Sequence, residues 1–239
     1  MLEESVNKKL VESAVQVQET LNPALWDGDK LKPEVIDTVK DIVELFLEES
    51  EIPIDVLDIY LVGSNASFNY AEHSDLDIHI VSNYELIDEN IPLVQAALQL
   101  QKASFNNSYN ISIHGVPVEL YVEDVNAGTV SNGIYSVFEE KWIKYPQPIE
   151  VQEYNLDYQI AKWGNVIEGV LEEHDEQAIT DCINTLYMMR KNSLAVDGEY
   201  GPGNQLFKAI RNEGLLDALK EALKAARSEN LTLESLVEE

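Results

Sequence analysis

A glycine-serine pair followed by two aspartates could bind a metal ion together with a phosphorylated substrate. Gly63 and Ser64 follow the apolar stretch DVLDIYLV, and ten residues later Asp75 and Asp77 begin the stretch DLDIHIV. Because alternate residues of a strand point to the same side, the two carboxylates would lie about 6.6 Å apart along one strand. Burying two like charges together is costly unless cations lie between them, and carboxylate oxygens suit Mg²⁺. The glycine would let a backbone approach a phosphate closely, and the serine would add a hydroxyl donor.

A third acid on a later strand could complete such a site. Glu119 lies between Val118 and Leu120, which would face the other side of a strand. A lone acid in an apolar strand is rarely a simple core residue. Glu123 has the same parity but would lie about 13 Å further along the strand, so Glu119 is the preferred third acid. His79 shares the face of the aspartates, where it is either a substrate contact or an ordinary hydrogen-bonded neighbour.

The order of these features resembles the DNA polymerase β-type nucleotidyltransferase superfamily. A strand ends in Gly-Ser, a ten-residue spacer leads to Asp75-Leu-Asp77, and a later strand carries an acid. The resemblance spans residues 55–123 and implies two Mg²⁺ ions, with Mn²⁺ as an alternative, that bind a triphosphate and stabilise the pyrophosphate leaving group. The third acid is often Asp in this superfamily, whereas here it is Glu119.

The resemblance also implies a role for each matching residue. Asp75 and Asp77 would hold the metal ions. Glu119 would complete the metal site and help to deprotonate the acceptor hydroxyl. Gly63 and Ser64 would hold the β- and γ-phosphates of the nucleotide.

Positive charge for a triphosphate is concentrated in one region of the chain. Residues 190–227 contain seven basic and five acidic residues, a balance of +2, whereas the rest of the chain sums to −30. A triphosphate needs local positive charge besides its metal ions, so Arg190, Lys208 and Arg211 are candidate nucleotide-binding residues. Ion pairing on the surface of helices accounts for most of the other basic residues.

The elements that must position these residues change in type along the chain. Apolar spacings of three and four predict a helix over 2–21 and another that begins at Pro33. The middle of the chain predicts strands at 55–63 and 75–81, a helix at 91–104, a hairpin at 110–122, and a strand or hairpin at 133–143. The later helices are predicted at 155–173, 175–194, 204–213, 215–226 and, for a short one, near 231–237.

This layout predicts an α+β fold in which a small mixed β-sheet forms a nucleotidyltransferase core. N-terminal helices precede the sheet, and a helical domain follows it. The boundary is placed near residue 150, which gives a catalytic domain over 1–150 and a C-terminal helical domain over 151–239.

Composition narrows the function further. The chain has 239 residues, 45% of them hydrophobic, and a net charge of −28. This charge disfavours a histone-like nucleic-acid binder and an electrostatic anchor to anionic membranes. The single cysteine, Cys182, excludes an intrachain disulfide and a cysteine-rich zinc module. We find no apolar run of the length of a membrane span and no signal peptide, so a cytoplasmic protein without membrane contact is expected.

The function predicted first is transfer of a nucleoside monophosphate from an NTP to a hydroxyl acceptor, with release of pyrophosphate. The acidic surface favours a small molecule, another nucleotide or a protein as the acceptor over long RNA. Two alternatives stay open. One is a non-catalytic module that kept the fold to sense nucleotide or hold a partner. The other is a structural interaction protein whose acid pair binds Ca²⁺.

Overall fold

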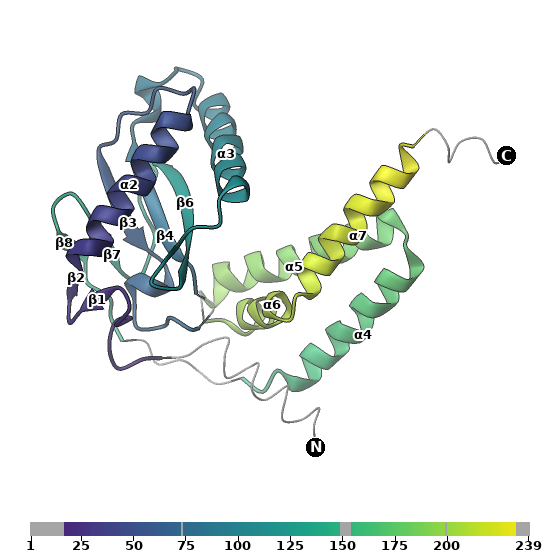
Figure 1. The fold of residues 1–239 in the computed structure, drawn as a ribbon. Helices are drawn as coiled ribbons and strands as arrows, with labels where there is room; N and C mark the ends of the chain where they lie inside the picture. Colours follow the sequence, from purple (N-terminus) through teal and green to yellow (C-terminus); the bar gives the residue numbers. More distant parts are fainter. Residues whose placement is uncertain (1–16, 73, 149–153, 199, 233–239) are drawn as a thin grey trace. The chain divides into compact units, whose positions relative to one another are not determined.

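The structure is a computed structural model that describes residues 17–72, 74–148, 154–198 and 200–232 (Figure 1). Across these residues the fold is α+β, as predicted, with six α-helices, a six-stranded mixed sheet and a two-stranded sheet. The chain divides into two compact units. Among the described residues, those within 17–148 form one, which we call the sheet unit, and those within 154–232 form the other, which we call the helical unit.

The sheet unit is built around the six-stranded sheet, in the strand order β5-β6-β4-β3-β7-β8. β3 pairs antiparallel with β4 and β7, whereas β4 and β6 run parallel, with α3 between them in the sequence. A two-residue hairpin, β1 and β2, precedes α2. The elements of this unit are β1 (Trp26–Asp27), β2 (Lys30–Leu31), α2 (Pro33–Glu49), β3 (Asp58–Val62), β4 (Leu76–Ser82), α3 (Ile91–Ser108), β5 (Ser112–Ile113), β6 (Val116–Asp124), β7 (Ile134–Ser136) and β8 (Lys141–Lys144).

One face of the sheet forms the core of this unit. Leu76, Ile78 and Ile80 of β4 are completely buried, as their alternation in the sequence predicts. They pack in one cluster with Leu120 of β6 and with the apolar stripe of α2. Figure 1 shows α2 lying against the strands. The helix begins at Pro33, where proline is favoured because the first amide of a helix has no partner within it.

The other face of the sheet is polar. Its side chains alternate with the buried ones, so β4 contributes Asp77 and His79, and β6 contributes Glu119, Tyr121 and Glu123. All five are half-buried. The candidate catalytic acids therefore belong to the face that the core does not use.

The prediction of a helix over residues 2–21 is wrong for its described end. Residues 17–21 are not helical, and residues 2–16 lie outside the described part of the chain. The amide of Gln18 instead donates to the carbonyl of Phe68 at 2.6 Å, and Leu21 is buried in the core of the sheet unit. Leu21 is thus buried by tertiary packing and not as part of a helix.

The helical unit has its own core. Its elements are α4 (Asp157–Glu173), α5 (Glu176–Val196), α6 (Pro202–Asn212) and α7 (Leu215–Asn230). Its buried residues, among them Ile167, Leu186 and Phe207, form a cluster that shares no member with the clusters of the sheet unit. Cys182 is buried here, and desolvation raises the pKa of its thiol. Most of the short helix predicted near 231–237 lies outside the described residues, and Leu231 and Thr232 are not helical.

None of the helices in the described ranges combines the length and the apolar character needed to cross a membrane.

Candidate active site

Asp77 is fitted against the glycine of the Gly-Ser turn. A Cβ atom added to Gly63 would lie 1.9 Å from Asp77 Oδ2. Gly63 also has a φ of +72°, which side-chain-bearing residues rarely adopt. Glycine is therefore required here both for the turn and for the approach of the carboxylate. The sequence predicted that the missing side chain of Gly63 leaves room for a phosphate. In the structure, the carboxylate of Asp77 occupies this room.

Glu119 lies beside Asp77 through the register of two parallel strands. The two residues are direct partners in the β4–β6 pairing, so their side chains leave the same face of adjacent strands. Asp75 comes immediately before β4, two residues from Asp77. We call Asp75, Asp77 and Glu119 the acid cluster.

The tyrosine hydroxyl of Tyr121 lies within the field of all three acids. Burial raises the pKa of this hydroxyl above its ordinary value, and a hydrogen bond to Glu119 and the charges of Glu119, Asp77 and Asp75 raise it further. The raised pKa keeps the Tyr121 hydroxyl protonated beside the Glu119 carboxylate.

Lys102 of α3 contacts the same carboxylate. Its Nζ lies 3.2 Å from Glu119 Oε1 and 3.6 Å from the centre of the Tyr121 ring. The Lys102 side chain is only 21% exposed, so water screens this ion pair less than an open surface pair. Glu119 thus forms an ion pair with the ammonium group of Lys102.

Asn65 links the Gly-Ser turn to the start of β4. Its Nδ2 donates to the carbonyls of Ser74 at 3.0 Å and Asp75 at 2.9 Å, and its Oδ1 accepts from Asn22 at 2.8 Å. The backbone carbonyl of Asn65 accepts from the Trp26 indole at 2.8 Å. Because Asn65 is fully buried, these bonds are shielded from water and fix the backbone of Asp75 next to the turn.

A loop from the other edge of β3 covers the turn. The amide of Gly63 donates to Ser131 Oγ at 3.2 Å, and Lys144 Nζ donates to the Ser131 carbonyl at 2.6 Å. A Cβ on Gly133 would lie 1.8 Å from the carbonyl oxygen of Ala66, so this loop packs directly on the turn. Lys144 therefore places an exposed ammonium group next to the loop that contacts the turn.

Ser64 begins a short 3₁₀ turn, Ser64–Ala66, and is half-buried. Its carbonyl accepts the amide of Ser67 at 3.1 Å, which closes the turn directly after Gly63. Its predicted role in phosphate binding stays a prediction.

His79 and Glu123 interact with each other further along the polar face. His79 Nδ1 lies 2.6 Å from Glu123 Oε2, and Thr129 donates to the other carboxylate oxygen at 2.8 Å. Glu123 is opposite Val81 in the strand register, four residues beyond Glu119. The Glu123 carboxylate is thus bound by His79 and Thr129. The acid opposite Asp77 in the strand register is Glu119.

The predicted basic residues belong to the helical unit, whereas the acid cluster lies wholly in the sheet unit. Arg190 lies on α5, where its guanidinium carbon is 5.0 Å from the centre of the Phe207 ring. Its Nε is buried without a hydrogen-bond partner among the described residues. Lys208 and Arg211 lie on α6, and Arg211 is exposed in its last turn.

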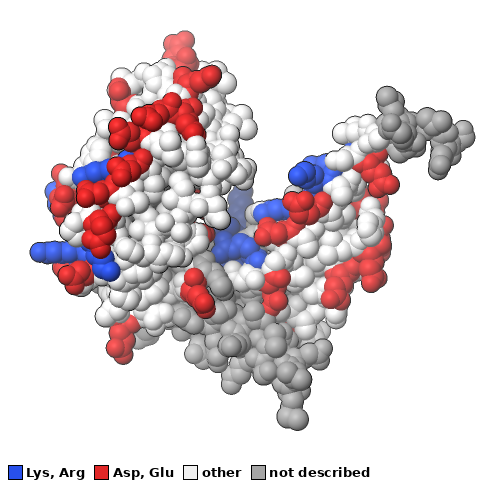
Figure 2. Space-filling model, viewed as in Figure 1, with Lys and Arg blue, Asp and Glu red and all other residues white. Residues whose placement is uncertain are grey.

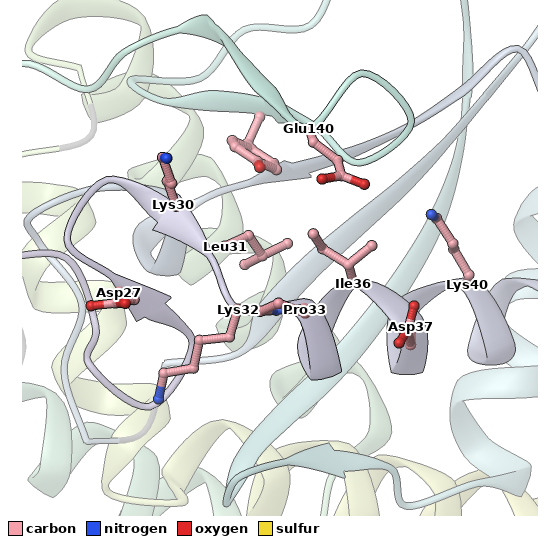
Figure 3. A pocket seen from close by; sticks show the side chains of 10 residues that line it. Asp27, Lys30, Leu31, Lys32, Pro33, Ile36, Asp37, Lys40 and Glu140 are labelled. Atoms are coloured by element: carbon pink, nitrogen blue, oxygen red, sulfur yellow. The ribbon is translucent and has the colours of Figure 1, made fainter.

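A separate cavity of about 490 Å³ lies at the start of α2 (Figure 3). Lys30, Lys32 and Lys40 contribute to its lining, as do the three acids Asp27, Asp37 and Glu140. The ammonium group of Lys32 already donates to the carbonyls of Pro23 and Ala24. The cavity contains none of the predicted site residues, and its charges balance.

The acid cluster fits a magnesium ion by its chemistry. Its donors are all carboxylate oxygens, and two of its members are side by side on adjacent strands. One of its oxygens, Oε1 of Glu119, is already in contact with Lys102. Within the described part of the chain, no three His, Cys, Asp or Glu side chains form a ready metal-binding group.

Lys102, Tyr121 and Asn65 were missed by the sequence analysis. Tyr121 could have been found, because it is two residues from Glu119 and therefore on the same strand face. Lys102 is the one charged residue between Ile91 and Ser108. In so acidic a chain, a lone lysine on a helix could have been recognised as a partner for an acid elsewhere. Asn65 gave no signal, because its partners depend on how the following loop folds back.

Comparisons of the chain with protein-family models, curated proteins and solved structures find no match. Function is therefore inferred from the geometry of the acid cluster and from the motif around it.

Proposed function

We propose that the protein is a metal-dependent nucleotidyltransferase that moves a nucleoside monophosphate from an NTP to a hydroxyl acceptor and releases pyrophosphate. The observation that carries this proposal is the position of Asp77, which is packed against Gly63 on one side and paired in register with Glu119 on the other. The sequence motif resembles that of the DNA polymerase β-type superfamily. The packing of Asp77 against Gly63 is a reason for the glycine of this motif.

Each residue of the site has its own role in the proposed reaction. Asp75 and Asp77 would hold magnesium, which supplies charge neutralisation at the triphosphate when it is bound. Glu119 lies beside Asp77 and would accept the proton of the acceptor hydroxyl. Ser64 adds a hydroxyl donor at the turn, and Lys144 adds a cation near it.

The charge of the protein bears on the acceptor. The net charge is −28, and Figure 2 shows acidic side chains at many points of the visible face. A polyanion as long as RNA would be repelled by such a surface, because its binding depends on neutralising phosphates. We therefore propose a small molecule, a nucleotide or a protein as the acceptor.

The test is an assay of pyrophosphate release. Full-length protein is incubated with Mg²⁺, each of the four NTPs in turn, and pools of metabolites, proteins and short RNAs. We expect release with at least one pair of NTP and pool. The Asp77→Asn variant, which keeps the shape of the side chain but removes its charge, should lose this activity by at least about a hundredfold.

Pyrophosphate release that is equal in the wild type and Asp77→Asn for every pair would contradict the proposal. Labelled NTP shows in the same reactions which pool receives the nucleotide. Transfer to the RNA pool alone would keep the enzyme but contradict the proposed acceptor class.

A further inference from the structure

We propose that the ammonium group of Lys102 takes the place of a second magnesium ion, so that the site binds one divalent ion on Asp75 and Asp77. This proposal rests on the proposed function, because it concerns the same carboxylates. The resemblance of the motif implies two ions, and the contacts of Glu119 point to one.

The first argument is the distance between Lys102 and Glu119. The ammonium nitrogen lies 3.2 Å from Oε1 of the carboxylate. A magnesium ion bound to Glu119 would lie about 2.1 Å from one of the same oxygens. Two cations so close together on one partly buried carboxylate repel each other strongly. With Lys102 at Oε1, an ion could bind Glu119 only through the remaining acceptor sites of the carboxylate and next to the ammonium charge.

The second argument is that the fold holds Lys102 in this place. The ammonium group also lies 3.6 Å from the centre of the Tyr121 ring, a favourable cation–π contact. Tyr121 and Glu119 are two residues apart on the same face of β6, so Lys102 contacts two neighbouring side chains of this strand. Asn106, one turn further along α3, bonds to both backbone groups of Leu120, the residue after Glu119.

The third argument is the absence of another acid near Lys102 in the sequence. The segment Ile91–Ser108 contains no Asp or Glu, so α3 itself offers the lysine no carboxylate. The pair Lys141–Glu139, in contrast, is a surface ion pair of 2.9 Å with both side chains more than half exposed. Lys141 therefore serves as a matched control for the loss of one lysine and one ion pair.

The experiment counts the Mn²⁺ ions bound per chain by electron paramagnetic resonance, with full-length protein and equimolar tripolyphosphate. Tripolyphosphate makes the count independent of the preferred base. The count for Asp77→Asn is subtracted, because it measures ions bound elsewhere on the acidic surface. We expect one ion for the wild type, Lys102→Arg and Lys141→Met, and two ions for Lys102→Met.

Two ions in the wild type, or one ion in Lys102→Met, would overturn the proposal and leave the metal site in place. A wild type that binds no more Mn²⁺ than Asp77→Asn would overturn the metal site itself, and the proposed function with it. Circular dichroism checks the fold of each variant. If Lys102→Met does not fold, Lys102→Gln is judged by the same count.

Discussion

At the scale of single residues, the position of the Asp77 carboxylate depends on the absence of a side chain at Gly63. We expect Gly63→Ala to bind Mn²⁺ at least about tenfold more weakly, because the new Cβ would lie 1.9 Å from Asp77 Oδ2 and must displace the carboxylate. The backbone of Gly63, with φ +72° and ψ −157°, lies in a region almost exclusive to glycine, so the alanine also costs about 1–3 kcal/mol of folding free energy. Metal titration measures the first effect, and urea denaturation measures the second.

The control for this prediction is Gly28→Ala. Gly28 also has a positive φ, +61°, but an added Cβ would meet no atom within 4 Å. It should therefore lose stability without losing metal affinity. Equal metal affinity in the two variants would contradict the coupling of Gly63 to Asp77.

Asn65 stabilises the start of β4 through its amide group. We expect Asn65→Ala to lower the free energy of unfolding by about 3 kcal/mol, because the buried carbonyls of Ser74 and Asp75 lose their donor. Denaturation in urea gives this value. Asn126→Ala is the matched control: among the described residues the side chain of this exposed residue bonds only to Asp124, and a change within about 0.5 kcal/mol is expected. Similar losses in both variants would show that Asn65 has no special role.

Residue types and strand parity predicted which acids share the polar face of the sheet, but not which basic side chain contacts them. The alternation in DLDIHIV was enough to separate Asp77 from the buried Ile78, and the same rule on β6 selected Glu119. The contact with Lys102 could not be predicted, because it depends on where α3 packs against β6. Helix packing is decided by tertiary contacts that a pattern of residues does not contain.

At the scale of elements, Asn106 connects α3 to the backbone of β6. Asn106 donates to the carbonyl of Leu120 at 3.1 Å and accepts from its amide at 3.2 Å. We expect Asn106→Ala to cost about 2 kcal/mol and to speed hydrogen exchange in a peptide covering Val116–Asp124. Asn107→Ala, at the exposed neighbouring position, should change neither quantity. Unchanged exchange in Asn106→Ala would mean that the apolar contacts of α3 and the contacts of Lys102 hold the helix without Asn106.

Element types were predictable where one local rule was dominant. Pro33 and a regular apolar stripe predicted α2, and Gly115 between two apolar stretches predicted the β5–β6 hairpin. The same spacing rule failed at residues 17–21. There Asn22 Oδ1 accepts from the amide of Ala24 at 3.0 Å and starts a turn, so the preceding leucine is buried without a helix.

At the scale of the whole molecule, the two units have separate apolar cores. Ile78 in the sheet unit and Ile167 in the helical unit are both completely buried, in clusters without a shared member. Truncation of either to Ala should cost about 2–5 kcal/mol in its own unit. We expect hydrogen exchange to rise within residues 157–230 for Ile167→Ala and within residues 26–144 for Ile78→Ala. Faster exchange throughout the chain in either variant would show that the units unfold together.

The parallel register of β4 and β6 determines where the chain tolerates a change of length. Asp77 and Glu119 face each other because of backbone pairing, so extra residues in the segment between Ser64 and Asp75 or after Asp124 would alter the surroundings of the acids and leave their separation unchanged. One extra residue inside either strand would turn every later side chain to the opposite face. Insertions and deletions in proteins with this site should therefore accumulate in the loops and be absent from the two strands.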